Sequence, residues 1–141
     1  MAYSAYVFDA YGTLFDVHAA VRRHAAAIGP DGQLLSELWR AKQLEYSWVR
    51  TLMGSYRDFW QLTEEALDYA FARVPSADPS QRQNLLDAYW QLDCYPEVPS
   101  VLKALKAAGY KVAASYAGND AAAEKFRSET GIPVYKWDVS S

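Results

Sequence analysis

Three short segments of strand character are distributed unevenly along this chain, and their spacing constrains the fold most. Ala5–Asp9 is an apolar run stopped by a glycine turn, which is typical of a buried strand. The other two candidates, 110–114 and 132–139, follow only after a long helical stretch. Strand, helix, strand, helix, strand is the rhythm of a parallel sheet. We therefore expect an α/β protein: a Rossmann-like parallel sheet core with an all-helical, four-helix cap inserted after the first strand.

The predicted boundaries are 1–16 and 93–141 for an incomplete α/β core and 17–92 for the cap. A cap helix over about 33–53 would place five apolar residues on one side: Leu34, Leu38, Ala41, Trp48 and Leu52. Ser55 is the expected cap of the next helix, with Asp58 in its first turn. A loop at 74–79 contains two prolines and separates that helix from the last one.

Composition and charge exclude several classes of partner. Lys and Arg number 14 and Asp and Glu 17, giving a net charge of −3, and no basic run favours nucleic acid or an anionic membrane. No apolar stretch approaches the ~20 residues of a membrane span. The single cysteine, Cys94, cannot form an internal disulfide, which fits a reducing compartment. We expect a cytoplasmic protein that binds no nucleic acid and no membrane.

Asp9 is the best candidate for chemistry. Ligands of open parallel sheets bind beyond the carboxyl ends of the strands, where Asp9 and the turn Ala10–Thr13 would lie. An ionised carboxylate there can act as a nucleophile, and Thr13 can fix its orientation by a hydrogen bond. Gly12 lets the backbone approach closely. On spacing alone, capping of the following turn is the commoner role of such an aspartate.

Residues 7–16, VFDAYGTLFD, resemble the first motif of the haloacid dehalogenase superfamily and, more narrowly, of its 2-haloacid dehalogenases. Most of that superfamily has a second aspartate two places after the nucleophile, where this chain has Tyr11. Loss of that carboxylate weakens support for a hard cation such as Mg²⁺. The resemblance therefore implies a dehalogenase that needs no metal and no cofactor, and a phosphatase is a distant alternative.

Two cap segments extend the resemblance. Residues 38–46 resemble the segment whose arginine, here Arg40, gathers the departing halide and helps to place the substrate carboxylate. Residues 56–60 resemble the segment whose Phe59 lines the apolar substrate pocket with Tyr11, and Leu44 joins them. A solvated helix-face arginine is the alternative for Arg40, and plain helix packing is the alternative for Phe59.

The resemblance implies hydrolytic dehalogenation of short 2-haloalkanoic acids. Asp9 would attack the carbon that bears the halogen, the halide would leave towards Arg40, and an aspartyl ester would form. Water would then hydrolyse the ester and release a 2-hydroxy acid of inverted configuration. The implied partners are a small 2-haloacid and a halide ion.

The dehalogenase pattern stops after Ala113. Of the family's Ser-Asn-Gly motif, only the glycine, Gly118, falls in register, and Ser115 is displaced from the position of the serine. The family's later lysine and its group of Ser, Asn and Asp are absent. Residues from about 104 to 141 resemble instead a fragment of a short-chain acetoacetyl-CoA reductase, in which Asp138 would approach adenine, but the glycine-rich phosphate loop is missing. The alternative function is therefore a catalytically inactive truncated or chimeric dehalogenase-like protein.

Three further expectations follow from the residues. His18 and His24 lack the neighbours of a metal site and are expected to be ordinary surface or cap histidines. Cys94 is expected to be a buried structural thiol. The first strand would have one unpaired edge, which favours pairing with another chain and a homodimer.

Overall fold

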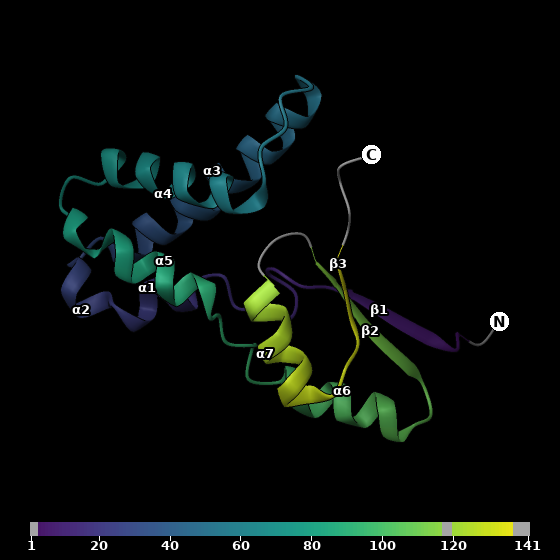
Figure 1. Ribbon diagram of the computed structural model, residues 1–141. Helices are drawn as coiled ribbons and strands as arrows, with labels where there is room; N and C mark the ends of the chain where they lie inside the picture. The colour runs from purple at the N-terminus through teal and green to yellow at the C-terminus, as the bar shows by residue number, and fades with distance from the viewer. Residues whose placement is uncertain (1–2, 117–119, 137–141) are drawn as a thin grey trace. The chain divides into compact units, whose positions relative to one another are not determined.

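The computed structural model describes residues 3–116 and 120–136 (Figure 1). Gly118 and Asp138, singled out above, lie outside them. The chain divides into two compact units: an α/β unit, Met1–Asp16 with Gln91–Ser141, and a helical unit, Val17–Trp90. The second junction therefore follows Trp90, two residues before the position expected from the sequence.

The α/β unit contains a parallel sheet of three strands in the order β1-β2-β3. The strands are β1 (Ala5–Asp9), β2 (Lys111–Tyr116) and β3 (Val134–Lys136). Helices α6 (Val98–Ala107) and α7 (Asp120–Thr130) precede β2 and β3. Because both crossovers step across the sheet in the same direction and are right-handed, the two helices lie on the same face (Figure 1). The parallel α/β rhythm predicted from the sequence is confirmed.

Within the α/β unit, the described helices cover one face of this sheet. Val112, Ala114 and Tyr116 alternate along β2 and are buried with Phe126 of α7. On the opposite face, Val7 is 68% exposed. The expectation that β1 is a buried strand is wrong, because β2 is its one strand partner among the described residues and no described helix of this unit lies over its open face.

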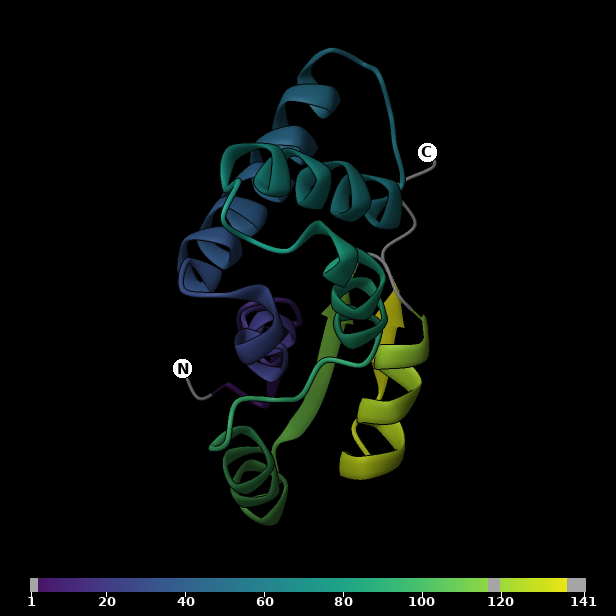
Figure 2. The same ribbon diagram turned by 90° about the vertical axis from the view of Figure 1, so that its left-hand side faces the viewer.

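The helical unit contains only helices and loops among its described residues (Figure 2). Its elements are α1 (Ala19–Arg23), α2 (Ala25–Ile28), α3 (Gly32–Leu52), α4 (Phe59–Arg73), the 3-10 helix η1 (Pro79–Gln81) and α5 (Arg82–Trp90). The all-helical insertion is confirmed. Five α-helices are present where the sequence predicted four, because the first stretch forms two short helices that meet at His24.

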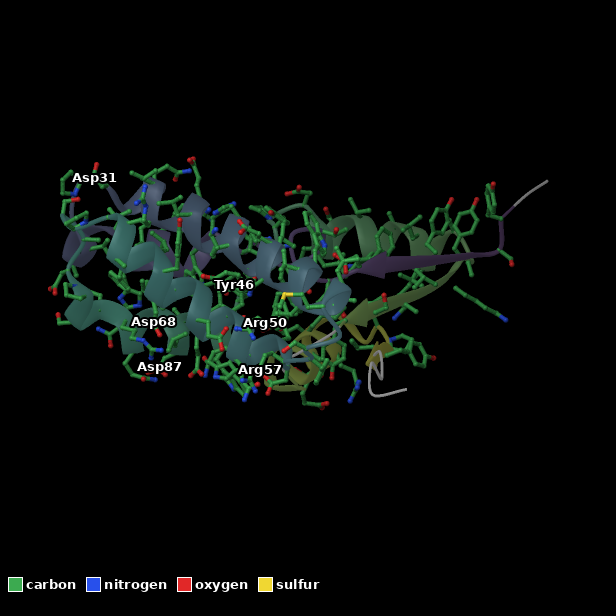
Figure 3. All side chains as sticks on the ribbon, turned by 90° about the horizontal axis from the view of Figure 1, so that it is seen from above. Asp31, Tyr46, Arg50, Arg57, Asp68 and Asp87 are labelled. Atoms are coloured by element: carbon green, nitrogen blue, oxygen red, sulfur yellow. The ribbon has the colours of Figure 1, made fainter. Side chains whose placement is uncertain are left out.

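Helices α3 and α4 lie side by side (Figures 1 and 2). An ion pair joins Arg50 of α3 to Glu65 of α4, and the ring of Tyr46 meets that of Tyr69 edge-on, with their centroids 6.5 Å apart. Tyr46 and Arg50 are labelled in Figure 3. These contacts link α3 to α4.

The length of α3 was predicted to within one residue at each end, but its buried face was not. Leu35 and Trp39 are buried together with the polar Ser36 and Gln43, whereas Leu52 is 87% exposed. The apolar spacing misidentified this face because two of its core positions are polar. Each is satisfied inside the unit: His18 Nδ1 lies 2.7 Å from Ser36 Oγ, and Gln43 forms the bonds described below.

Asp58, rather than Ser55, caps helix α4. Its Oδ1 accepts the N–H of Gln61 at 2.9 Å, and its backbone is extended, as expected of an N-cap. The helix begins at Phe59, three residues later than the sequence suggested, because Ser55 lies directly after the left-handed Gly54 that follows α3.

Replacing the Asp58 side chain should destabilise the protein. We expect Asp58→Ala to lower the free energy of unfolding by about 1 kcal/mol, because the Gln61 N–H loses its acceptor. Ser55→Ala is the matched control and should stay within about 0.5 kcal/mol of the parent. Urea unfolding followed by circular dichroism measures both, and equal effects of the two variants would contradict the assignment of the cap.

Cys94 is half-buried, and burial, with a smaller contribution from Glu129, raises the pKa of its thiol to about 11. The thiol is therefore neutral at pH 8, and its reactivity should rise only as the pH approaches 11. We expect iodoacetamide to alkylate the folded chain at pH 8 roughly a hundredfold more slowly than the urea-unfolded chain. Mass spectrometry follows the reaction at this single cysteine. Equal rates in the two states would show that the thiol is not protected.

Candidate active site

A tight turn follows β1 and fixes the backbone around Asp9. The carbonyl oxygen of Ala10 accepts the N–H groups of Thr13, Leu14 and Phe15 at 3.3, 2.9 and 2.8 Å. Gly12 has a φ of 92° and donates its N–H to the carbonyl of Phe15 at 2.9 Å. A side chain at this position would be strained, so the turn requires the glycine.

This turn brings Thr13 to Asp9. Asp9 is the last residue of β1 and is exposed, and the Thr13 hydroxyl donates to its Oδ2 across 3.4 Å, a long hydrogen bond. The contact predicted between these side chains is therefore present. Ser115 is displaced from the position of the serine in the family pattern. In the structure it pairs with Asp9 across the strands, and its hydroxyl donates to the Phe8 carbonyl at 3.4 Å.

Tyr11 lies at the same end of the sheet but is buried. Its ring packs against Phe15 with centroids 5.7 Å apart, and Phe15 meets Phe126 of α7 edge-on at 5.5 Å. The turn is thus attached to the core of the α/β unit through aromatic contacts. The pocket role predicted for Tyr11 stays a prediction.

The other three predicted site residues, Arg40, Leu44 and Phe59, belong to the helical unit. Leu44 and Phe59 are half-buried, and Phe59 is the first residue of α4. Arg40 is also half-buried, and its Nη1 donates to Oε1 of Gln43 at 2.8 Å. The guanidinium therefore has a specific acceptor within its own unit, which a fully solvated helix-face arginine would not need.

Gln43 and its neighbours form a buried polar network that the sequence reasoning did not identify. Gln43 Nε2 donates to the Thr63 hydroxyl at 2.5 Å, and Tyr89 donates to Gln43 Oε1 at 3.2 Å. Burial raises the pKa of Tyr89 to about 12, against the opposing influence of nearby Arg40, so the phenol keeps its proton and its role as donor. The available signal was the spacing from Arg40 to Gln43, which places both on one side of α3.

The described residues also bear on metal binding and on membrane insertion. No group of three or more His, Cys, Asp or Glu among them could hold a metal ion. Within the same part of the chain, no helix is long and apolar enough to cross a membrane.

The chain resembles curated bacterial dehalogenases in sequence. It is 55% identical over 117 residues to (S)-2-haloacid dehalogenase 1 of Pseudomonas sp. strain CBS-3, a match over 82% of this chain and 52% of that protein. It is 52% identical to (S)-2-haloacid dehalogenase 4A of Burkholderia cepacia over 82% of this chain and 51% of that protein. The chain thus spans about half the length of these relatives.

Solved structures show the same similarity in three dimensions. A dehalogenase crystal structure matches 96% of this chain and 62% of its own length, with a TM-score of 0.84 and 43% identity. The L-2-haloacid dehalogenase of Xanthobacter autotrophicus with chloropropionic acid covalently bound matches 99% of this chain and 58% of its own, with a TM-score of 0.78 and 35% identity.

The C-terminal third follows the same family. The sequence model of the haloacid dehalogenase-like hydrolases matches residues 3–141, across the point where the sequence suggested a change of family. The resemblance to an acetoacetyl-CoA reductase receives no support from these matches, and the fusion inferred from it loses its basis. Matched over nearly its whole length by that model and more than half identical to curated dehalogenases, the chain belongs to the haloacid dehalogenase-like hydrolases.

Proposed function

We propose that this chain acts on short 2-haloalkanoic acids by hydrolytic dehalogenation, with Asp9 as the nucleophile. The observation that carries the proposal is the exposed Asp9 carboxylate at the carboxyl end of β1, with the Thr13 hydroxyl directed at its Oδ2. The same substrate class is supported by the name of a curated relative, (S)-2-haloacid dehalogenase 1, and by the chloropropionic acid covalently bound in a matched structure.

The proposed reaction has two steps. An oxygen of the Asp9 carboxylate forms a bond to C2 of the substrate while the carbon–halogen bond breaks, and the halide leaves with the bonding electrons. Water then adds to the Asp9 carboxyl carbon, which releases the 2-hydroxy acid with inverted configuration and one proton and restores the carboxylate. Because Thr13 donates to Oδ2, Oδ1 is the oxygen left available for attack.

Arg40 is proposed to receive the halide and to help place the substrate carboxylate. A guanidinium keeps its charge at all working pH values and binds anions well in a partly dry site. Tyr11, Phe59 and Leu44 are proposed to line the apolar pocket around the carbon that bears the halogen.

Chloride release from (S)-2-chloropropionate tests the proposal. We expect release by the parent chain and a loss of roughly a thousandfold or more in Asp9→Asn, which lacks the nucleophilic oxygen. Asp87→Asn, at an exposed aspartate of α5, is the control and should behave as the parent. Equal background release from the parent and Asp9→Asn would exclude dehalogenation by this chain.

The second candidate function is a catalytically inactive protein that keeps the first half of the fold. It is favoured by the length of the matches, about half of each curated relative. Mass spectrometry after incubation with substrate separates the possibilities. A stable adduct on Asp9, with one chloride released per chain, would indicate that the first step proceeds without the second, whereas an unmodified chain and no chloride would support the inactive protein.

We further propose that the chain forms a homodimer through β1. Lys111 N–H donates to the Ser4 carbonyl at 3.1 Å, so by strand alternation the backbone groups of Ala5, Val7 and Asp9 point away from β2. These groups form a sheet edge with exposed Val7 at its centre. A two-fold axis can pair this edge with the same edge of a second copy.

A charge on this edge should prevent the pairing. We expect the parent chain to sediment as a dimer at concentrations on the order of tens of micromolar. Val7→Lys should sediment as a monomer, because the strand edge gains a repelling charge. Leu52→Lys, at an even more exposed apolar residue of the helical unit, is the control and should stay dimeric. A monomeric parent, or a dimer that only Leu52→Lys disrupts, would overturn the proposal.

A further inference from the structure

Gln43 lies at the centre of a hydrogen-bond network whose polarity is fully determined. The arginine side chain can only donate, so the atom of Gln43 that Arg40 Nη1 contacts at 2.8 Å must be the amide oxygen. The nitrogen Nε2 therefore faces Thr63 Oγ1, at 2.5 Å. The side-chain amide of Gln43 thus has one possible orientation.

The network continues to the start of α4. The Thr63 hydroxyl donates to the carbonyl of Phe59 at 2.8 Å, which leaves its lone pair to accept from Gln43. The backbone carbonyl of Thr63 accepts the indole N–H of Trp39 at 2.8 Å. A continuous chain of donors and acceptors therefore runs from Arg40 on α3 to Phe59 on α4, two of the predicted site residues.

The part of the network around Gln43 and Thr63 is shielded from water. Gln43 is 2% exposed and Thr63 is fully buried, and Trp39 and Tyr89 pack against each other with ring centroids 4.9 Å apart. Tyr89 supplies a second donor to the oxygen that receives Arg40. In such surroundings a bond between a guanidinium and an amide oxygen is strong, and the rotation of both groups is restricted.

We propose that Gln43 is a positioning residue: its amide oxygen, anchored by Thr63 and Tyr89, fixes the orientation in which Arg40 presents its guanidinium to the departing halide. This inference rests on the anion-binding role proposed for Arg40. It adds a specific task for a buried glutamine that would otherwise be interpreted as a satisfied polar residue of the helical core.

Side-chain NMR of the ¹⁵N-labelled chain tests the inference without requiring turnover. The guanidinium signals of Arg40 are assigned by their loss in Arg40→Lys. In the parent chain we expect separate Nη–H signals, because the bond to Gln43 slows rotation of that group. In Gln43→Leu these signals should merge. The affinity for bromide, measured from the shift of the Arg40 signals as sodium bromide is added, should fall about tenfold.

Variants of the same network and a matched glutamine control separate positioning from folding. Gln43→Glu keeps an acceptor and should keep the separate signals, as should Thr63→Ser, whereas Thr63→Val removes the anchor and should merge them. Gln33→Leu alters an exposed glutamine of α3 whose side chain donates to Glu37, and it should leave Arg40 unchanged. Backbone spectra show whether each variant is folded.

Two results would overturn the inference. The first is a folded Gln43→Leu chain with the Arg40 signals and bromide affinity of the parent. The second, applicable if that variant does not fold, is a folded Thr63→Val chain with the Arg40 signals of the parent. If bromide does not shift Arg40 in the parent while Gln43→Leu still releases the guanidinium, the anion-binding role fails and the positioning contact stands.

Discussion

The carbonyl oxygen of Ala10 accepts three backbone N–H groups, and the geometry of the candidate nucleophile depends on this one acceptor. It closes the turn after β1, and the positive φ of Gly12 allows the chain to reverse within four residues. Thr13 is thereby returned to the carboxylate of Asp9. A freely rotating side chain at a strand end would present its oxygens in many directions, whereas this turn gives one of them a defined partner.

The helical unit positions its own candidate residues by a different physical device. Its core contains Ser36, Gln43 and Thr63 where a simple amphipathic bundle would contain aliphatic side chains. Burying such groups is costly unless each finds a partner, so their bonds are directional constraints as well as packing. One of these constraints holds Arg40. The stability of the unit and the orientation of its arginine therefore depend on the same bonds.

The sheet of the α/β unit illustrates the limits of short-range reasoning. The alternation of β2 is visible in the sequence, and burial of Val112, Ala114 and Tyr116 follows from it. The run Ala5–Asp9 has the composition of a buried strand, yet its residues are exposed or half-buried. Burial of a strand depends on which helices and strands neighbour it, and that information is not contained in the strand itself.

The sequence alone determined the class of the protein: local periodicity identified the helices and strands, and residues 7–16 identified the family and made Asp9 the candidate nucleophile. The ends of α3 were predictable because helix formation is governed by neighbours along the chain. Tertiary structure decided which face of α3 is buried and that Thr63 and Tyr89 anchor the side-chain amide of Gln43. The last case shows the reason most plainly: the partners Thr63 and Tyr89 lie 20 and 46 residues from Gln43, and only folding brings their donors and acceptors within bonding distance.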